Sequence, residues 1–217
     1  GRVSFALDRR MHSMLVALAQ RCGTTTFVVL HSAVALLLHE LGAGDRFTIG
    51  ATVALRDRSE LTDVFGLLVN TVALPSGVDL ERSFAELVTR THANDVEALQ
   101  HSNVEFDAVV EALNPERRPD RTPWIDVLIT MGVGDKDFVS DYGAHGASGA
   151  TLLLPGLPVT GQYPTPMPTA RFPLTFAVTE RFEGESPAGL LGALEYSDRV
   201  GGLQGERLVE RLEWLLT

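Results

Sequence analysis

An apolar run with two polar residues in its middle lies at Val64–Leu74 (VFGLLVNTVAL), and Pro75-Ser-Gly77 closes it. A strand with one solvated face alternates apolar and polar residues, so this pattern predicts a strand buried on both faces. Asn70 and Thr71 interrupt that surface, where an unpaired polar group costs about 1–3 kcal/mol. We therefore expect both side chains to bond neighbouring segments or to face a solvent-filled channel.

The remaining hydrophobic pattern predicts five helices and five more strands. Apolar spacings of three and four predict helices from Asp8 to Gly23, from Thr24–Thr26 to Gly42, and over 80–99, 106–113 and 203–216. Further strands are predicted at 3–7, 47–55, 124–131, 172–179 and 189–196. The helix that ends at Gly42 is almost entirely apolar, so we expect it at the centre of the core. The order of elements predicts an α/β fold in which helices flank a mixed β-sheet.

Three segments have the composition of connections. Residues 114–123 carry prolines that restrict the backbone to extended or turn geometry, and half of the residues at 180–187 are charged. Residues 132–170 are rich in glycine, proline and serine, and loops of that length are usually functional or disordered. No internal repeat or second domain boundary is evident, so the 217 residues are predicted to form one unit.

Composition and charge exclude several classes of partner. The formal net charge is -10 and no stretch clusters Lys and Arg, which argues against nucleic-acid binding. No uninterrupted apolar run reaches the roughly 18 residues that span a bilayer, and the N-terminus lacks a signal-peptide pattern. Cys22 is the single cysteine, so we expect no intramolecular disulfide and a thiol that packs as a small hydrophobe. A soluble, cytoplasmic protein is expected, cut from a longer chain because it begins at Gly1.

Motifs for self-contained catalysis are missing from the sequence. Neither a phosphate-binding glycine loop nor a Gly-x-Ser-x-Gly elbow occurs. The six histidines are scattered and none stands in a motif with a partner acid. We expect His31 and His39 to be one packed and one surface residue rather than a metal pair, and His92 and Asp95 to form a surface pair.

Three stretches together resemble the condensation domains of nonribosomal peptide synthetases. The most specific is Ile49–Arg56 (IGATVALR) with Glu60-Leu61 and Phe65–Thr71 (FGLLVNT), which is similar to the family run Ile-Gly-Thr-Pro-Val-Ala-Gly-Arg, Glu-Leu and Gly-x-Phe-Val-Asn-Thr. His101–Asp107 (HSNVEFD) is similar to the element His-Gln-Asp-Val-Pro-Phe-Glu, and Arg117–Pro123 to Arg-x-x-Ser-Arg-x-Pro. Residues 171–176 and 192–196 also look like this family, so the resemblance covers essentially the whole chain.

The resemblance implies a fold and a task. Condensation domains have two lobes that resemble chloramphenicol acetyltransferase and face each other across a tunnel; a His-His-x-x-x-Asp-Gly motif in the first lobe carries the chemistry. This sequence has no such motif. The resemblance therefore implies one C-terminal lobe over residues 1–217, with residues 132–170 as the segment that crosses to the other lobe. Expected partners are the N-terminal lobe, donor and acceptor carrier proteins with phosphopantetheine arms, and an adenylation domain. No metal or directly bound cofactor is implied.

Six residues in the matching motifs are candidates for the tunnel or for its framework. For Asn70, with Thr71 beside it, a structural amide is favoured over a tunnel-facing hydrogen-bond donor. Arg56 is expected to pair with Glu60 or Asp63, with a phosphopantetheine phosphate as the alternative. Structural roles are likewise favoured for the last three candidates, His101, Arg117 and Arg121.

Three functions stay open at this point. The chain is expected to be half of an amide-forming enzyme and inactive alone; the alternatives are a non-catalytic module that docks a partner protein and half of a stand-alone acyltransferase. Thr52, Leu55, Leu67, Glu105 and Asp120 depart from the family pattern, while the Val-Asn-Thr core favours condensation over epimerisation. Self-association is expected, because the missing lobe would leave apolar surface exposed.

Overall fold

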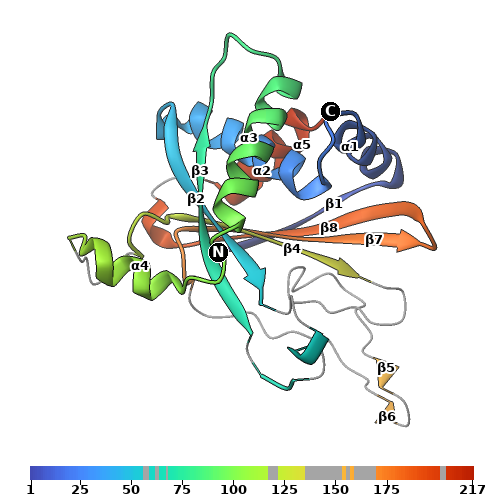
Figure 1. Ribbon diagram of the computed structural model, residues 1–217. Coiled ribbons are helices and arrows are strands. Elements are labelled where there is room, and N and C mark those ends of the chain that lie inside the picture. Colours follow the sequence, from blue (N-terminus) through green and yellow to red (C-terminus); the bar gives the residue numbers. More distant parts are fainter. Residues whose placement is uncertain are drawn as a thin grey trace.

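The computed structural model describes residues 1–55, 59–61, 64–66, 68–116, 122–134, 153–154, 157–158, 170–200 and 204–217 (Figure 1). Its helices are α1 (Arg9–Arg21), α2 (Thr26–Leu38), α3 (Phe84–Leu99), α4 (Phe106–Leu113) and α5 (Gly205–Leu215). Its strands are β1 (Arg2–Leu7), β2 (Arg46–Ala54), β3 (Val69–Gly77), β4 (Val127–Gly134), β5 (Leu153–Leu154), β6 (Leu157–Pro158), β7 (Leu174–Glu183) and β8 (Ser186–Tyr196). Short helical turns cover His39–Ala43, Ser59–Leu61 and Asp198–Val200.

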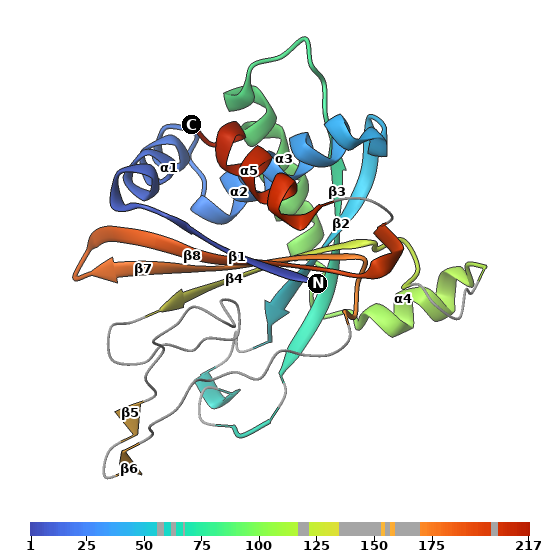
Figure 2. The same ribbon diagram turned by 180° about the vertical axis from the view of Figure 1, so that it is seen from behind.

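Six strands form one mixed sheet in the order β1-β8-β7-β4-β2-β3. The central strand β4 pairs in parallel with both β2 and β7, and the other neighbours are antiparallel. Helices α1, α2, α3 and α5 lie together on one face of the sheet, whereas α4 lies beside the edge strand β3 (Figures 1 and 2). The predicted α/β class, a mixed sheet flanked by helices, is confirmed.

The helices begin where side chains can satisfy their first backbone N–H groups. Asp8 accepts a hydrogen bond from Met11 N at 2.7 Å at the start of α1. At α3, Ser83 and Glu86 form a capping box, so the helix begins at Phe84 and not at the predicted Leu80. Caps thus set these boundaries more sharply than apolar spacing does.

Helix α2 occupies the centre of the core, as predicted. Eleven of its thirteen residues are buried, and it contacts α1, α3 and α5. Together with the turn that follows, Thr26–Ala43 has the length and a mean hydropathy of 1.6 that a membrane span would need. A buried core helix passes the same test, and this segment also contains His31, His39 and Glu40, so the expectation that no uninterrupted apolar run is long enough to span a bilayer is not contradicted.

The predicted strand over Val64–Leu74 differs from the observed one in its start and in its burial. Strand β3 starts at Val69, while Val64 and Phe65 are exposed outside it. Because β3 is an edge strand, burial alternates along it, and only Asn70, Val72, Leu74 and Ser76 are buried. The apolar run resembled a doubly buried strand because its other face lines a groove, described below.

Two further boundaries also differ from prediction. Strands β7 and β8 continue through most of residues 180–187 and turn at Gly184, whose φ is 63°. Arg181, Glu183 and Glu185 lie at the exposed end of this hairpin, whereas Glu180 is buried. Strand β4 starts only at Val127, because Trp124 has a φ of 60° that a strand cannot accommodate. Most of the long segment over 132–170 lies outside the described residues.

Candidate functional site

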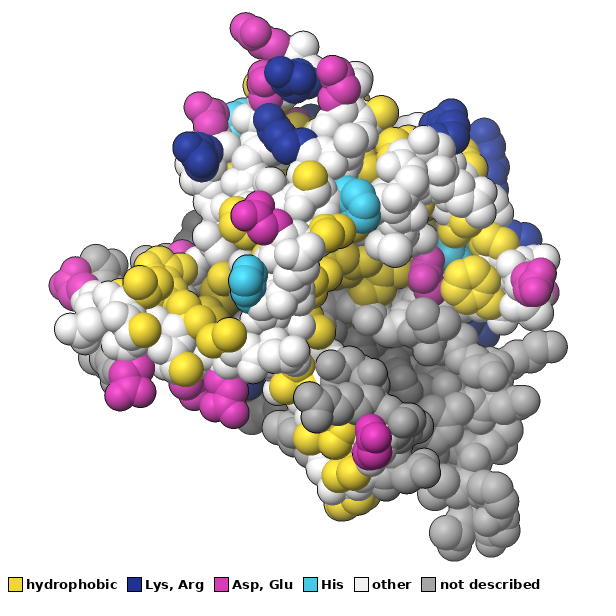
Figure 3. Space-filling model, viewed as in Figure 1, with side chains coloured by type: hydrophobic (Ala, Val, Ile, Leu, Met, Phe, Trp, Pro, Cys, Tyr) yellow, Lys and Arg dark blue, Asp and Glu magenta, His cyan; other side chains and the backbone are white. Residues whose placement is uncertain are grey.

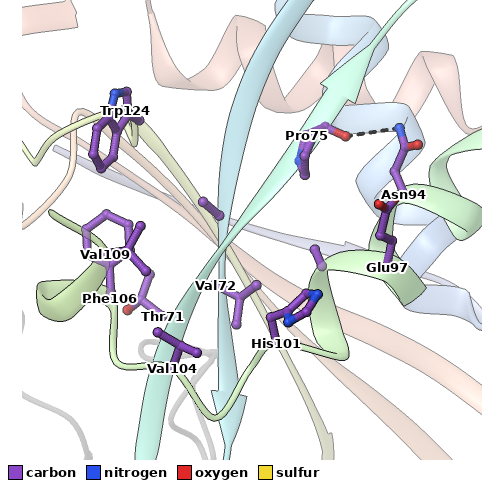
Figure 4. A pocket seen from close by; sticks show the side chains of 12 residues that line it. Thr71, Val72, Pro75, Asn94, Glu97, His101, Val104, Phe106, Val109 and Trp124 are labelled. Carbon is purple, nitrogen blue, oxygen red and sulfur yellow. Dashed lines mark hydrogen bonds between the residues drawn. The ribbon is translucent and has the colours of Figure 1, made fainter. Parts of the chain in front are cut away.

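A groove of about 500 Å³ follows the outer edge of β3. Figure 4 shows Asn94, Glu97 and His101, from α3 and the turn after it, on one side of the strand, and Phe106, Val109 and Trp124 on the other. Thr71, Val72, Ala73 and Pro75 of β3 form the floor, and Ala98 and Val104 complete the lining. The groove is therefore mostly apolar, with its polar groups on the α3 side.

Asn70 joins β3 to the segment that connects α3 with α4. Its Nδ2 donates to the carbonyl oxygens of Ser102 (2.8 Å) and Val104 (2.7 Å). Its Oδ1 accepts from the backbone N–H groups of Thr71 (2.8 Å) and Phe106 (3.3 Å). Phe106 is the first residue of α4, whose N-cap Glu105 supplies no side-chain bond, so Asn70 also caps this helix. One buried amide uses its full hydrogen-bonding capacity to hold one end of the groove.

The other sequence-predicted candidates are distributed unevenly. Thr71 and His101 both line the groove, and His101 is exposed, with no hydrogen bond from its imidazole to another described residue. Arg56, Arg117 and Arg121 lie outside the described residues, so their ion pairs and loop contacts stay predictions. The structure thus brings together Asn70, Thr71 and His101 around one edge of the sheet.

A buried Ser–His–Asp constellation lies behind the groove, and the sequence analysis missed it. His31 Nδ1 is 3.0 Å from Asp95 Oδ2, and His31 Nε2 is 2.8 Å from Ser76 Oγ. The contacts follow the order of a hydrolase triad, but Ser76 is only 7% exposed, does not line the groove, and lies 3.2 Å from its neighbour Leu74 O. A nucleophile must reach substrate, so these residues link α2, α3 and β3 and do not form an active site.

The predicted surface pair of His92 and Asp95 was wrong. Asp95 is 1% exposed and bonds His31, whereas His92 Nδ1 is 2.9 Å from Thr24 Oγ1. Asp95 follows Val88 and Thr91 at spacings of three and four, which places it on the buried face of α3. That spacing was the available signal. As predicted, His31 is buried and His39 is near the surface.

A second buried histidine also has an acidic partner. His12 Nε2 is 3.0 Å from Glu180 Oε1, and His12 Nδ1 accepts a hydrogen bond from Gly189 N at 3.1 Å. The partners come from α1, β7 and β8, so this pair fastens the first helix to the β7–β8 hairpin. Among the described residues, no group of three His, Cys, Asp or Glu side chains could hold a metal ion.

Exposed apolar side chains cluster at the groove and at the start of β3. Val104, Leu113 and Trp124 are 50%, 66% and 43% exposed, and Figure 3 shows hydrophobic side chains gathered over α4. Val64 and Phe65, which precede β3, and Val69, its first residue, are also exposed. Patches of this kind mark surfaces that contact other proteins.

Comparison with known proteins assigns the chain to a family: residues 1–180 match the family model of the condensation domain. The chain belongs to the condensation-domain family. A probable non-canonical nonribosomal peptide synthetase, CymA, of Salinispora arenicola is 32% identical over 196 residues, which are 90% of this chain and 2% of that protein. The dimodular nonribosomal peptide synthase of Bacillus subtilis is 30% identical over 216 residues, 99% of this chain and 8% of that protein. The resemblance predicted from the motifs is confirmed.

Solved structures of the same family share the fold. The X-domain from teicoplanin biosynthesis superposes with a TM-score of 0.80 at 25% identity, covering 100% of this chain and 47% of that chain. The first condensation domain of the CDA synthetase gives a TM-score of 0.67 at 16% identity, covering 100% of this chain and 44% of that chain. The chain therefore spans about half of each of these structures and a small part of the synthetases.

Proposed function

We propose that residues 1–217 form the second lobe of a nonribosomal peptide synthetase condensation domain. The observation that carries this proposal is the coverage of solved relatives: the whole chain superposes on 44–47% of a condensation domain and of an X-domain. The part of those folds left uncovered is about as large as this chain. A partner lobe of similar size is what a two-lobed domain with a tunnel between its lobes requires.

The proposed reaction joins an acceptor amine to a donor acyl group held as a thioester. The amine nitrogen attacks the thioester carbonyl, the C–N bond forms, the C–S bond breaks, and the thiol leaves with the proton lost by nitrogen. In the resembling family, a histidine of the first lobe promotes this attack. No two histidines are adjacent in this sequence, so the His-His-x-x-x-Asp-Gly motif must come from the other lobe and the isolated chain is expected to be inactive.

Within this proposal the chain provides one wall of the tunnel and part of its partner surface. Donor and acceptor carrier proteins present their substrates on phosphopantetheine arms, and an adenylation domain loads one of them. Asn70 and Thr71 position the wall and do not touch the reacting atoms. The exposed apolar residues Val64, Phe65 and Val69 contact the first lobe and favour self-association without it. Like the synthetase that contains it, the domain works in the cytoplasm.

A second candidate function rests on the structural comparison. The teicoplanin X-domain, which was also solved in a complex with OxyB, is more similar to this chain than the CDA condensation domain is, at 25% against 16% identity. The alternative is therefore a module that docks a partner protein and catalyses no condensation.

The gene separates the two candidates before any assay. An intact His-His-x-x-x-Asp-Gly motif encoded upstream of Gly1 supports the enzyme, and a degenerate motif there contradicts it. The two-lobed domain with an intact motif should form amide from loaded donor and acceptor carrier proteins, whereas its variant with the second motif histidine changed to alanine should not. Product from the alanine variant at the unmodified rate would contradict the proposed chemistry.

A further inference from the structure

The outer edge of β3 carries backbone groups in the middle of the groove that no other described residue pairs with. Leu55 N donates to Leu68 O and Val78 N to Asp45 O, so the even-numbered residues of this strand direct their backbone groups toward β2. The odd-numbered residues therefore direct theirs outward, because successive residues of a strand alternate. An open sheet edge of this kind can pair with another chain.

Side chains cover both ends of this edge. Asn70 Oδ1 accepts from Thr71 N, Asn94 Nδ2 donates to Pro75 O at 3.2 Å, and Arg90 Nη2 donates to Gly77 O at 2.6 Å. Pro75 has no N–H group. Among the described residues, nothing bonds the outward carbonyl of Thr71 or the outward N–H and carbonyl of Ala73. These three groups form a short open stretch at the floor of the groove.

The walls of the groove define the chemistry of an occupant. Val104, Phe106 and Trp124 offer apolar contacts on one side. Glu97 is the only Asp, Glu, Lys or Arg among the residues that line the groove, and it has no ion-pair partner among the described residues. A suitable occupant would have backbone donors and acceptors for the open edge of β3, apolar side chains for the apolar wall, and one positive charge for Glu97.

We propose that the open stretch of β3 at Thr71–Ala73 binds an extended basic segment of a partner polypeptide by strand addition, with a Lys or Arg of that segment at Glu97. Strand addition draws its affinity from main-chain hydrogen bonds and its selectivity from the side-chain contacts beside them. A second copy of this chain would bring another Glu97 and a net charge of -10 to the same edge. An anionic phosphopantetheine arm would also meet Glu97, so a basic peptide fits better than either. The proposal applies equally to a condensing and to a docking domain.

The test uses the ¹⁵N-labelled chain and an acetylated, amidated hexapeptide, Thr-Val-Lys-Val-Thr-Val. A hydrogen bond to the carbonyl of a peptide residue is expected to move the Ala73 amide proton downfield and to slow its exchange. The same peptide N-methylated at its central backbone amides keeps its side chains but loses donors, so we expect about tenfold weaker binding. Equal binding of the methylated peptide, or an unmoved Ala73 amide at saturation, would overturn the proposal.

Two variants test the charge and the backbone group separately. Glu97→Lys should weaken binding of the lysine peptide about fivefold and strengthen binding of a peptide with Glu in place of Lys. Glu210→Lys on the exposed face of α5 is the matched control and should change the affinity for neither peptide.

Ala73→Pro removes the backbone N–H group and should abolish binding. Its melting temperature checks that the fold is unchanged, and Pro75 shows that this edge accommodates proline. Dimers formed through β3 without peptide would contradict the proposal in favour of a second copy.

Discussion

Two buried histidine–carboxylate pairs hold opposite sides of this fold, and they are built differently. Both rings are fully buried, and each lies 3.0 Å from an acid: His12 from Glu180 and His31 from Asp95. The first pair fastens α1 to the β7–β8 hairpin, and the second links α2 to α3 behind the groove. The difference lies in what the other ring nitrogen contacts.

The His12 ring has fixed hydrogen-bonding roles. Because Gly189 N–H donates to Nδ1, that nitrogen is the acceptor and Nε2 carries the proton that it donates to Glu180. A second proton on the ring would face the Gly189 N–H group. The site therefore needs an acceptor at residue 180, but it does not need a charge there.

The His31 ring can donate from both nitrogens. Ser76 Oγ can accept from Nε2 while its own hydroxyl donates to Leu74 O, and Nδ1 faces Asp95. Asp95 Oδ1 is buried without a partner among the described residues, so the carboxylate depends on the ring for its compensation. Loss of either partner would therefore leave a buried polar group without its hydrogen-bond partner, which is costly. The same two residue types thus fix the roles of both ring nitrogens at one place, where a backbone N–H occupies Nδ1, and let both nitrogens donate at the other.

The largest expected effect is that of Asp95→Ala. Removing one partner of this buried acid–base pair leaves the other without compensation in the core, so we expect a loss of about 3–5 kcal/mol in the free energy of unfolding, measured by urea denaturation. The double variant His31→Leu, Asp95→Leu should recover a substantial part of this loss. A loss below about 1 kcal/mol for Asp95→Ala would contradict the role of Asp95 as the buried partner of His31.

Glu180→Ala is expected to cost about 1–3 kcal/mol, the penalty for a neutral donor left unpaired. Glu180→Gln should cost less, because its amide oxygen can still accept from His12 Nε2. Its ¹⁵N signals should continue to show an unprotonated His12 Nδ1. If Glu180→Gln lowers the free energy of unfolding as much as Glu180→Ala does, an acceptor at residue 180 is not sufficient. That result would contradict the difference between the two histidine sites.

Asn70→Ala extends the comparison to a link made by an amide. The variant loses four hydrogen bonds, and we expect it to lower the free energy of unfolding by about 1–3 kcal/mol. Hydrogen exchange at Phe106 N should accelerate well beyond exchange in α2. Asn94→Ala, which removes only the bond to Pro75 O, is the matched control with a smaller expected effect. Equal protection of Phe106 in both variants would contradict the capping role of Asn70.

The smallest effect is expected at a partly exposed ion pair. Hydrogen bonds from Arg211, at 2.8 and 2.7 Å, hold the pKa of Glu40 below its ordinary 4.5. A lowered folded pKa means that the pair stabilises the protein above pH 4.5 and that this contribution is lost as the pH falls through the folded pKa. Glu40→Gln should therefore lower the free energy of unfolding by less than about 1 kcal/mol at pH 7. It should not lower it at a pH below the folded pKa of Glu40, where the carboxyl is protonated in both states. A difference that grows on acidification would have the wrong sign.

Apolar periodicity predicted the helices and the sheet class because both depend on local spacing. It predicted α2 as the core helix for the same reason. It did not predict that β3 is an edge strand, because an apolar face along a groove resembles an apolar face inside a core. It also missed Asp95 as the partner of His31, since residues 64 positions apart meet only through the packing of α2 against α3. Asn70 was recognised as an anomaly, but its partners at 102–106 required the structure.

We propose that this chain is one lobe of a condensation domain and depends on the other lobe for its chemistry. The most direct test measures amide product from loaded donor and acceptor carrier proteins with residues 1–217 alone and with the first lobe supplied in the same polypeptide. The account predicts no product above the buffer rate for residues 1–217 and turnover for the two-lobed domain. Turnover by residues 1–217 alone would contradict it.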